Sequence, residues 1–449
     1  MVQKSPPHVK PYLADFAALE RNGFSHEPTW VQDLRREAIA RFGELGFPTS
    51  RRGNEEWKYT DIGPIAKATF HVRMEAPSSV LTRSEVEAHA FAGAQRNRLV
   101  FVDGRYAPEH SSVEALPQGT FLGRLEEAFI SHSHLIAQHL GKHADFQANA
   151  FTALNTAFVQ DGMFLHVAPG TTLPGPIQVL FLSTRSDSGS VVHPRLLVLM
   201  GQDAQAHLIE THASLNEGPY FTNVVTEVVL GRGAKLEHSR LQAESPHAYH
   251  VASTHVLQQA NSTYTSLAID TGGGLVRNNL IVVLNEQEAH ADMNGLYLLK
   301  GEQHVDYNTF IDHAVPHTSA KELYKGILDG HAHAIFGGKV LVRNGAFGTE
   351  SRQINKTLLL SQGAAIDTKP QLEIYADDVK CAHGAAVGQL DTEALFYLKS
   401  RGLGDTEARA LLTYGFVSEV LHSVSHIPFR AYLDQMVHAQ MQRSNELDQ

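Results

Sequence analysis

The stretch EVVLGRGAKLEHSRL, residues 227–241, consists of two short β-rich runs on either side of a Gly-Arg-Gly turn. The same order of apolar run, polar turn and second run recurs, and the runs LLVLM, EVVL, THVL and IVVL end at residues 200, 230, 257 and 284. The intervals between these ends are therefore 30, 27 and 27 residues. A unit of this size cannot bury its own apolar face, so it gains a core by stacking on its neighbours. The repeat predicts a β-solenoid.

Two later runs, KVLVRNG and TLLLSQG, look like further turns of the solenoid with a different spacing. The competing interpretation is an ordinary β-sandwich, which is also built from many short strands and turns. We favour the solenoid because the interval repeats.

Helical patterns flank this region on both sides. In residues 29–45, TWVQDLRREAIARFGEL, apolar side chains recur four apart with charges between them, as in an amphipathic helix. After the strands stop, Asp391 and Asp405 each open a stretch that begins like a capped helix, and a third helix is expected from Pro428. The expected domains are a mainly helical N-terminal domain, a β-solenoid core and a helical C-terminal domain, at residues 1–150, 151–390 and 391–449 respectively.

Composition excludes several classes of function. The 449-residue chain carries a formal net charge of -11, and its basic residues are scattered rather than gathered into a stripe, so we expect no nucleic-acid partner. No run of about 18 apolar residues is present, and the N-terminus lacks an apolar signal core, so we expect neither a membrane span nor secretion. With one cysteine there is no internal disulfide, which fits the cytoplasm or an organelle matrix.

That cysteine lies in DDVKCAHGAAVGQLD, residues 377–391. Cys381 and His383 are two positions apart, so on a strand their side chains share one face, roughly 6 to 7 Å apart. A thiolate and an imidazole suit iron, zinc or an iron-sulfur cluster. Such sites need three or four ligands, so the others would come from distant residues or from another chain. A lone cysteine is also typical of a small buried apolar position.

A second group of candidate residues lies in HVDYNTFIDHAVPHTSAKELYKG. Its histidines and carboxylates are His304, Asp306, Asp312, His313 and His317. They could ligate a metal or act as acid and base, which would make the chain a metal-dependent β-helix lyase or hydrolase. Alternating polar residues are equally typical of a solvated strand face, and the spacing H-E-x-x-H is absent. The run HAHA, with His331 and His333, allows the same two interpretations.

Nucleotide-binding motifs are missing. FGGKVLV, around Lys339, resembles the end of a phosphate-binding loop but lacks the upstream glycine and the following Ser or Thr. Neither G-x-S-x-G nor G-x-G-x-x-G occurs. If the process in which this chain takes part consumes ATP, we expect another subunit to hydrolyse it.

The stretch DTKPQLEIYADDVKCAHGAAVGQLDTEALFYLKSRGL, residues 367–403, resembles the shared core of the SufB/SufD family of iron-sulfur cluster assembly proteins. YKGILDG, FGGKVLVRNGA and SRQINKTLLLS extend this resemblance upstream to Tyr324. The segment RRGNEEWKYTDI, residues 51–62, is similar to a segment of the SufD members. The single cysteine also favours SufD, because SufB-like chains are typically richer in cysteine.

The resemblance implies a right-handed parallel β-helix between helical N-terminal and C-terminal domains, in a non-catalytic scaffold subunit. It implies pairing with SufB edge to edge through the β-helix, contact with the ATPase SufC through the C-terminal helices, and a homodimer when SufB is absent. It also implies that His383 lies at the SufB interface and helps to build a transient iron-sulfur cluster, or to hold iron, shared with that partner. Cys381 matches the neighbouring family cysteine, and a reduced flavin could take part in the complex.

Overall fold

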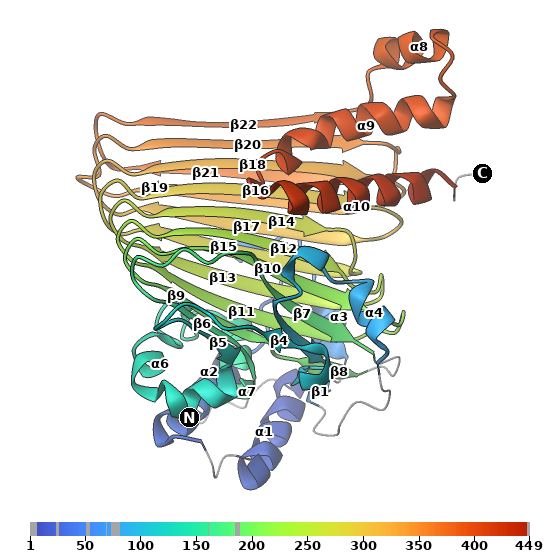
Figure 1. Ribbon diagram of the computed structural model, residues 1–449. Coiled ribbons are helices and arrows are strands. Elements are labelled where there is room, and N and C mark those ends of the chain that lie inside the picture. Colours follow the sequence, from blue (N-terminus) through green and yellow to red (C-terminus); the bar gives the residue numbers. More distant parts are fainter. Residues whose placement is uncertain are drawn as a thin grey trace.

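The computed structural model describes residues 7–23, 27–50, 54–68, 70–72, 81–159, 161–184 and 189–446. The first six residues of the chain and the first three of the 51–62 segment lie outside this description. Figure 1 shows a tall stack of long strands with helices at both ends. No helix among the described residues is long and apolar enough to cross a bilayer.

The strands form two sheets. The first contains β1 (His71–Val72), β5 (Phe121–Arg124), β6 (Gly162–Val167), β8 (Ser190–Val192), β9 (Arg195–Met200), β11 (Phe221–Leu230), β13 (Tyr249–Gln258), β15 (Leu275–Leu284), β17 (His304–His313), β19 (His333–Val342) and β21 (Ala365–Ile374). The second contains β2 (Asn97–Val102), β3 (Arg105–Tyr106), β4 (Ser112–Val113), β7 (Ile177–Ser183), β10 (Gln205–Ser214), β12 (Lys235–Ala243), β14 (Thr263–Asp270), β16 (His290–Leu299), β18 (Ser319–Leu328), β20 (Glu350–Leu359) and β22 (Lys380–Gly388).

From β9 onward, successive strands alternate between the two sheets, and each strand pairs in parallel with the strand two places later in the chain. One turn of the chain therefore adds one strand to each sheet, which is the topology of a β-solenoid and confirms that prediction over the β-sandwich. Consecutive turns stack their inward side chains into one continuous apolar cluster, which extends from β2 to β19. This stacking is how a unit of about 30 residues obtains a core.

The register of the strands corrects the apolar alignment at one place. Met200 pairs with Leu230, as the repeat predicts. On the following turn, the register partner of Leu230 is Gln258 rather than Leu257, and Gln258 in turn pairs with Leu284. Gln258 is fully buried and donates hydrogen bonds to Ser262 and to the His290 carbonyl. The alignment on apolar residues was wrong here because a polar side chain occupies the inward position.

The N-terminal helices cover the first turns of the solenoid (Figure 1). They are α1 (Lys10–Gly23), α2 (Thr29–Leu45), α3 (Gly63–Lys67), α4 (Arg83–Glu87), α5 (Leu125–Ser131), α6 (Ser133–His139) and α7 (Ala150–Phe158), with short 3-10 helices η1 (Pro7–Val9), η2 (Glu55–Trp57), η3 (Ala92–Ala94) and η4 (Pro108–His110). The predicted helix over residues 29–45 is confirmed as α2. An aromatic cluster joins α2 to α7, with Phe47 in ring contact with Phe42 and Phe151.

The C-terminal region forms α8 (Thr392–Ser400), α9 (Asp405–Leu421) and α10 (Ile427–Glu446). Asp391 caps α8 as expected, accepting hydrogen bonds from the backbone of Glu393 and Ala394. The N-cap of α9 is Gly404 rather than Asp405, which lies in the first turn, and α10 begins one residue before Pro428. Figure 1 shows α9 and α10 along the solenoid face, with α8 projecting beyond the last strands.

A lysine fixes the C-terminal helices to the solenoid. Lys325, on the outward face of β18, is 5% exposed and donates a 2.7 Å hydrogen bond to the Phe416 carbonyl on α9. It also pairs with Glu419 at 2.6 Å. Around it, Val417 and Phe429 pack with Leu296 and other outward side chains of the second sheet in a separate apolar cluster.

Candidate metal centre at the last turn of the solenoid

Cys381 and His383 both lie on β22, the last strand of the second sheet. Cys381 is half-buried and packs against the interior apolar cluster, so it points inward. His383 is two residues further on and shares this inward face, but it is exposed because no described turn follows to cover it. The structure therefore places the two side chains on one face at the open end of the solenoid, as the spacing predicts.

The chemistry of this pair is that of an incomplete site. Burial raises the pKa of the Cys381 thiol, so the thiol form dominates near neutral pH until a metal or a cation displaces the proton. The imidazole of His383 is accessible from the open end. Two donors are fewer than iron, zinc or a cluster requires, so this face can hold such a ligand only together with groups from elsewhere.

The side chains beneath the pair were not identified from the sequence. Ser351 is the register partner of Cys381, and Gln353 is the register partner of His383. Gln353 is 1% exposed and donates a 2.6 Å hydrogen bond to Glu322, which is 2% exposed on the turn below. Burial raises the pKa of Glu322 to about 7. The Oγ of Ser351 and the Oε1 of Gln353 are buried, and neither has a hydrogen-bond partner in the part of the chain that the structure describes.

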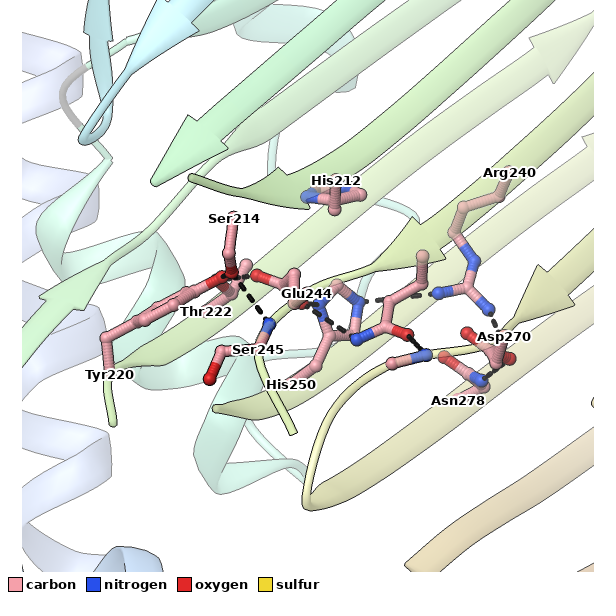
Figure 2. A network of polar contacts seen from close by, with 12 residues as sticks. His212, Ser214, Tyr220, Thr222, Arg240, Glu244, Ser245, His250, Asp270 and Asn278 are labelled. Atoms are coloured by element: carbon pink, nitrogen blue, oxygen red, sulfur yellow. Dashed lines mark hydrogen bonds and ion pairs between the residues drawn. The ribbon is translucent and has the colours of Figure 1, made fainter. Parts of the chain in front are cut away.

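A second polar group lies deeper inside the solenoid (Figure 2). Glu244 is 2.6 Å from Nδ1 of His250, and Nε2 of His250 is 3.4 Å from the Arg240 guanidinium. Because a guanidinium only donates hydrogen bonds, Nε2 accepts and Nδ1–H donates to Glu244, so His250 is neutral. Burial also lowers the pKa of His250. Arg240 also donates a hydrogen bond to Asp270, which accepts a second one from Asn278 at 2.7 Å.

Each polar residue of this network has a hydrogen-bonding partner on its own turn or on a neighbouring turn, which is what a buried charge requires. The signal in the sequence is the alternation within strands such as KLEHSRLQA, where polar residues occupy alternate, inward positions. This alternation identifies the inward polar residues only when the strand register is known, because a shift of one residue exchanges the inward and outward faces.

The residues of the 304–317 group lie on different faces. His304 and Asp306 are on the outer face of the first sheet, where Thr60 of the N-terminal region approaches both at 3.2 and 2.5 Å. Arg277 bonds Asp306 and lies 4.3 Å from the Trp57 ring. Burial lowers the pKa of His304 to about 4. These contacts hold the N-terminal region against the solenoid.

The other members of the group have their own partners. Asp312 accepts two hydrogen bonds from Arg343, at 2.9 and 2.6 Å. His313 is fully buried and bonded to Thr318 at 2.8 Å, and burial lowers its pKa to about 4. His317 lies in a turn and packs on Phe347.

The run HAHA is likewise divided. His331 is exposed in a turn, whereas His333 on β19 bonds Asp367 at 2.8 Å and contacts the His304 ring. Across the described ranges, no three His, Cys, Asp or Glu side chains are grouped so that they could hold a metal ion. The structure does not bring the five residues of the 304–317 group together, so its geometry does not favour the lyase or hydrolase.

The open end of the solenoid has the features of a binding surface. Strands β21 and β22 end the two sheets, and within the described residues neither has a neighbour on its outer edge. Large apolar side chains are exposed there, at Ile374, Tyr375 and Val387. Unpaired strand edges beside exposed apolar side chains are a template for pairing with another chain.

Comparison with known proteins agrees with this architecture. Residues 7–179 match the family model described as the SufBD protein N-terminal region, and residues 181–416 match that of the SUF system FeS cluster assembly SufBD core domain. The chain is 34% identical over 419 residues to an iron-sulfur cluster assembly SufBD family protein of Synechocystis sp., covering 92% of this chain and 91% of that protein.

Two relatives carry the name iron-sulfur cluster assembly protein SufD. The protein of Escherichia coli is 30% identical over 403 residues, covering 89% of this chain and 91% of the relative. That of Bacillus subtilis is 25% identical over 422 residues, covering 92% and 93%. With two family models spanning most of its length and relatives aligned over nearly all of theirs, the chain belongs to the SufB/SufD family of SUF iron-sulfur cluster assembly proteins.

Proposed function

We propose that this protein is a non-catalytic, SufD-type scaffold subunit on which an iron-sulfur cluster is assembled jointly with a SufB partner. The observation that carries the proposal is the position of His383 and Cys381, two metal-binding side chains on the uncovered last turn of the solenoid. A half-site at an open sheet edge suits a cluster that is shared across a subunit boundary. The cluster, or the iron that enters it, is cargo, and the partner supplies the missing ligands.

The shape of the open end supports a partner with the same kind of solenoid. Among the described residues nothing pairs with the outer edges of β22, nine residues long, and β21, ten residues long, so the partner's own end strands could continue both sheets. Exposed apolar residues of the last turn, such as Tyr375 and Val387, would be buried in the process. The same surface would serve for a homodimer when SufB is absent.

The C-terminal helices support contact with the ATPase SufC, which would hydrolyse the ATP. Helix α8 has no buried residue, and Phe396 and Tyr397 are 74% and 56% exposed on it. Such side chains on a projecting helix are typical of a protein-binding surface. We place the complex in the cytoplasm, and the participation of a reduced flavin stays a prediction.

The test is assembly with purified partners. The chain is mixed with SufB and SufC, the complex is isolated by size exclusion, and cluster formation with ferrous iron, sulfide and ATP is followed anaerobically by visible absorption and circular dichroism. His383→Ala should abolish cluster formation while the complex still assembles and melts at the same temperature. The matched control is His331→Ala, which removes an exposed imidazole from a turn away from the last strand.

Two results would count against the proposal. If the chain forms no complex with SufB or SufC, the scaffold role is wrong. If the complex forms and the His383→Ala variant gives the normal cluster yield, then the assignment of the ligand is wrong and the pairing stands. The parallel Cys381→Ser variant shows whether the thiol is a second ligand.

A further inference from the structure

We propose that Gln353 is a positioning residue for His383: its carboxamide oxygen accepts a hydrogen bond from one imidazole nitrogen and thereby leaves the other nitrogen free for the metal. Glu322 and Gly338 hold Gln353 in the orientation that this role requires. The inference rests on the proposed role of His383 as a ligand. It adds two buried side chains, Gln353 and Glu322 on the two preceding turns, that orient this ligand.

The register puts the two side chains within reach of each other. Gln353 on β20 is the direct partner of His383 on β22, and adjacent strands of a sheet lie about 4.8 Å apart. Both side chains occupy the inward face. His383 is exposed at the top of this column, whereas Gln353 forms its floor and is 1% exposed.

Two neighbours fix the Gln353 side chain. Gly338 lies across the interior on β19, and a Cβ atom at that position would be 2.0 Å from Nε2 of Gln353. The carboxamide therefore fills the space that a glycine leaves open. This explains the second glycine of FGGKVLV, a run whose resemblance to the end of a phosphate-binding loop was only superficial.

The hydrogen bonds show which end of the Gln353 carboxamide can still accept a donor. The amide nitrogen of Gln353 donates to Oε2 of Glu322 at 2.6 Å, and an amide nitrogen can only donate. The amide oxygen, Oε1, is therefore the end of the carboxamide that Glu322 does not engage, and no described residue donates a hydrogen bond to it although it is buried. A buried acceptor without a donor costs free energy, so a donor that reaches it is favoured.

The imidazole of His383 is a suitable donor. A metal-bound histidine usually gives its second ring N–H to a carbonyl or carboxylate oxygen, which fixes both the tautomer and the ring orientation. With Gln353 as acceptor, the remaining nitrogen of His383 carries its lone pair toward the open end of the solenoid. Metal and partner would then meet an imidazole that is already oriented.

The experiment measures Co²⁺ affinity in the assembled complex by the visible absorption of the bound ion, with thermal melting as the check on folding. Gln353→Leu should weaken Co²⁺ binding about tenfold, the lower end of what loss of such a support costs. Glu322→Leu should act in the same direction, whereas Glu322→Gln keeps an acceptor for the Gln353 amide and should bind as the wild type does. Gly338→Ala should displace the Gln353 carboxamide without changing its chemistry, and it should weaken Co²⁺ binding in the same direction.

A double-mutant cycle separates positioning from a general structural effect. If Gln353 acts through His383, adding Gln353→Leu to His383→Ala should weaken Co²⁺ binding no further. Equal losses in both backgrounds, or an unchanged affinity in Gln353→Leu, would overturn the inference while leaving His383 as a ligand. An unchanged affinity in His383→Ala itself would instead refute the proposed function.

Discussion

Replacing the buried Glu322 by glutamine should make the protein more stable at alkaline pH. Burial raises the pKa of this carboxyl from 4.5 to about 7, so the folded state holds the proton more tightly than the unfolded chain. Its contribution is therefore fully present below pH 4.5 and is lost as the pH rises through 7. At 1.36 kcal/mol per unit the whole effect is about 3 kcal/mol, most of which falls between pH 5 and pH 8.5.

The assay is urea unfolding of wild type and Glu322→Gln at pH 5, 7 and 8.5, because the difference between the two proteins cancels the titration of all shared groups. Glutamine keeps the shape and still accepts a hydrogen bond from Gln353, so the variant should gain roughly 2–3 kcal/mol of stability on wild type across this range. The control is Glu217→Gln, which removes an exposed charge and should change stability by less than about 0.5 kcal/mol. A flat difference between wild type and Glu322→Gln, or one that falls with pH, would refute the reasoning.

Two further predictions concern the ties between the solenoid and its flanking helices. Arg195→Met leaves the fully buried Glu227 without its 2.5 Å partner and should cost about 3–5 kcal/mol in urea unfolding. A loss below about 1 kcal/mol would show that the backbone amides of Gly141 and Ala144, which also donate to Glu227, are enough to stabilise its charge. Lys325→Met removes the bond to the Phe416 carbonyl, worth about 1.5–3 kcal/mol, so hydrogen exchange in α9 should speed up at least tenfold with the solenoid amides unchanged. Unchanged exchange in α9 would mean that the apolar contacts alone hold this helix.

Local patterns in the sequence predicted the features that depend on neighbouring residues. The helix at residues 29–45 and the cap at Asp391 follow from spacing and side-chain chemistry within a few positions, and both are confirmed. The stacked architecture follows from the repeat interval, and the shared face of Cys381 and His383 follows from strand geometry alone. The family resemblance, carried by motifs from Tyr324 to Leu403, added the expectation of a shared site.

The inward polar positions required the tertiary structure. Gln258 occupies the inward position at which Leu257 was expected, because an alignment on apolar residues slips by one residue where the inward side chain is polar, and a slip of one residue exchanges the faces. Glu322, Gln353 and His383 are about 30 residues apart and become a column only when three turns stack. No pattern among neighbouring residues spans a separation of that length in the sequence.

The dependence on strand register also explains why residues 304–317 were candidates for one shared site. Five residues close in the chain were candidates for one site, yet alternation along β17 sends Asp306 outward to Arg277 and His313 inward to Thr318. Spacing along the chain was enough to predict the repeat, the helices and the candidate pair on β22. Only the stacking of turns decided which polar side chains meet, because in a solenoid each residue's nearest neighbours lie one full turn away in the chain.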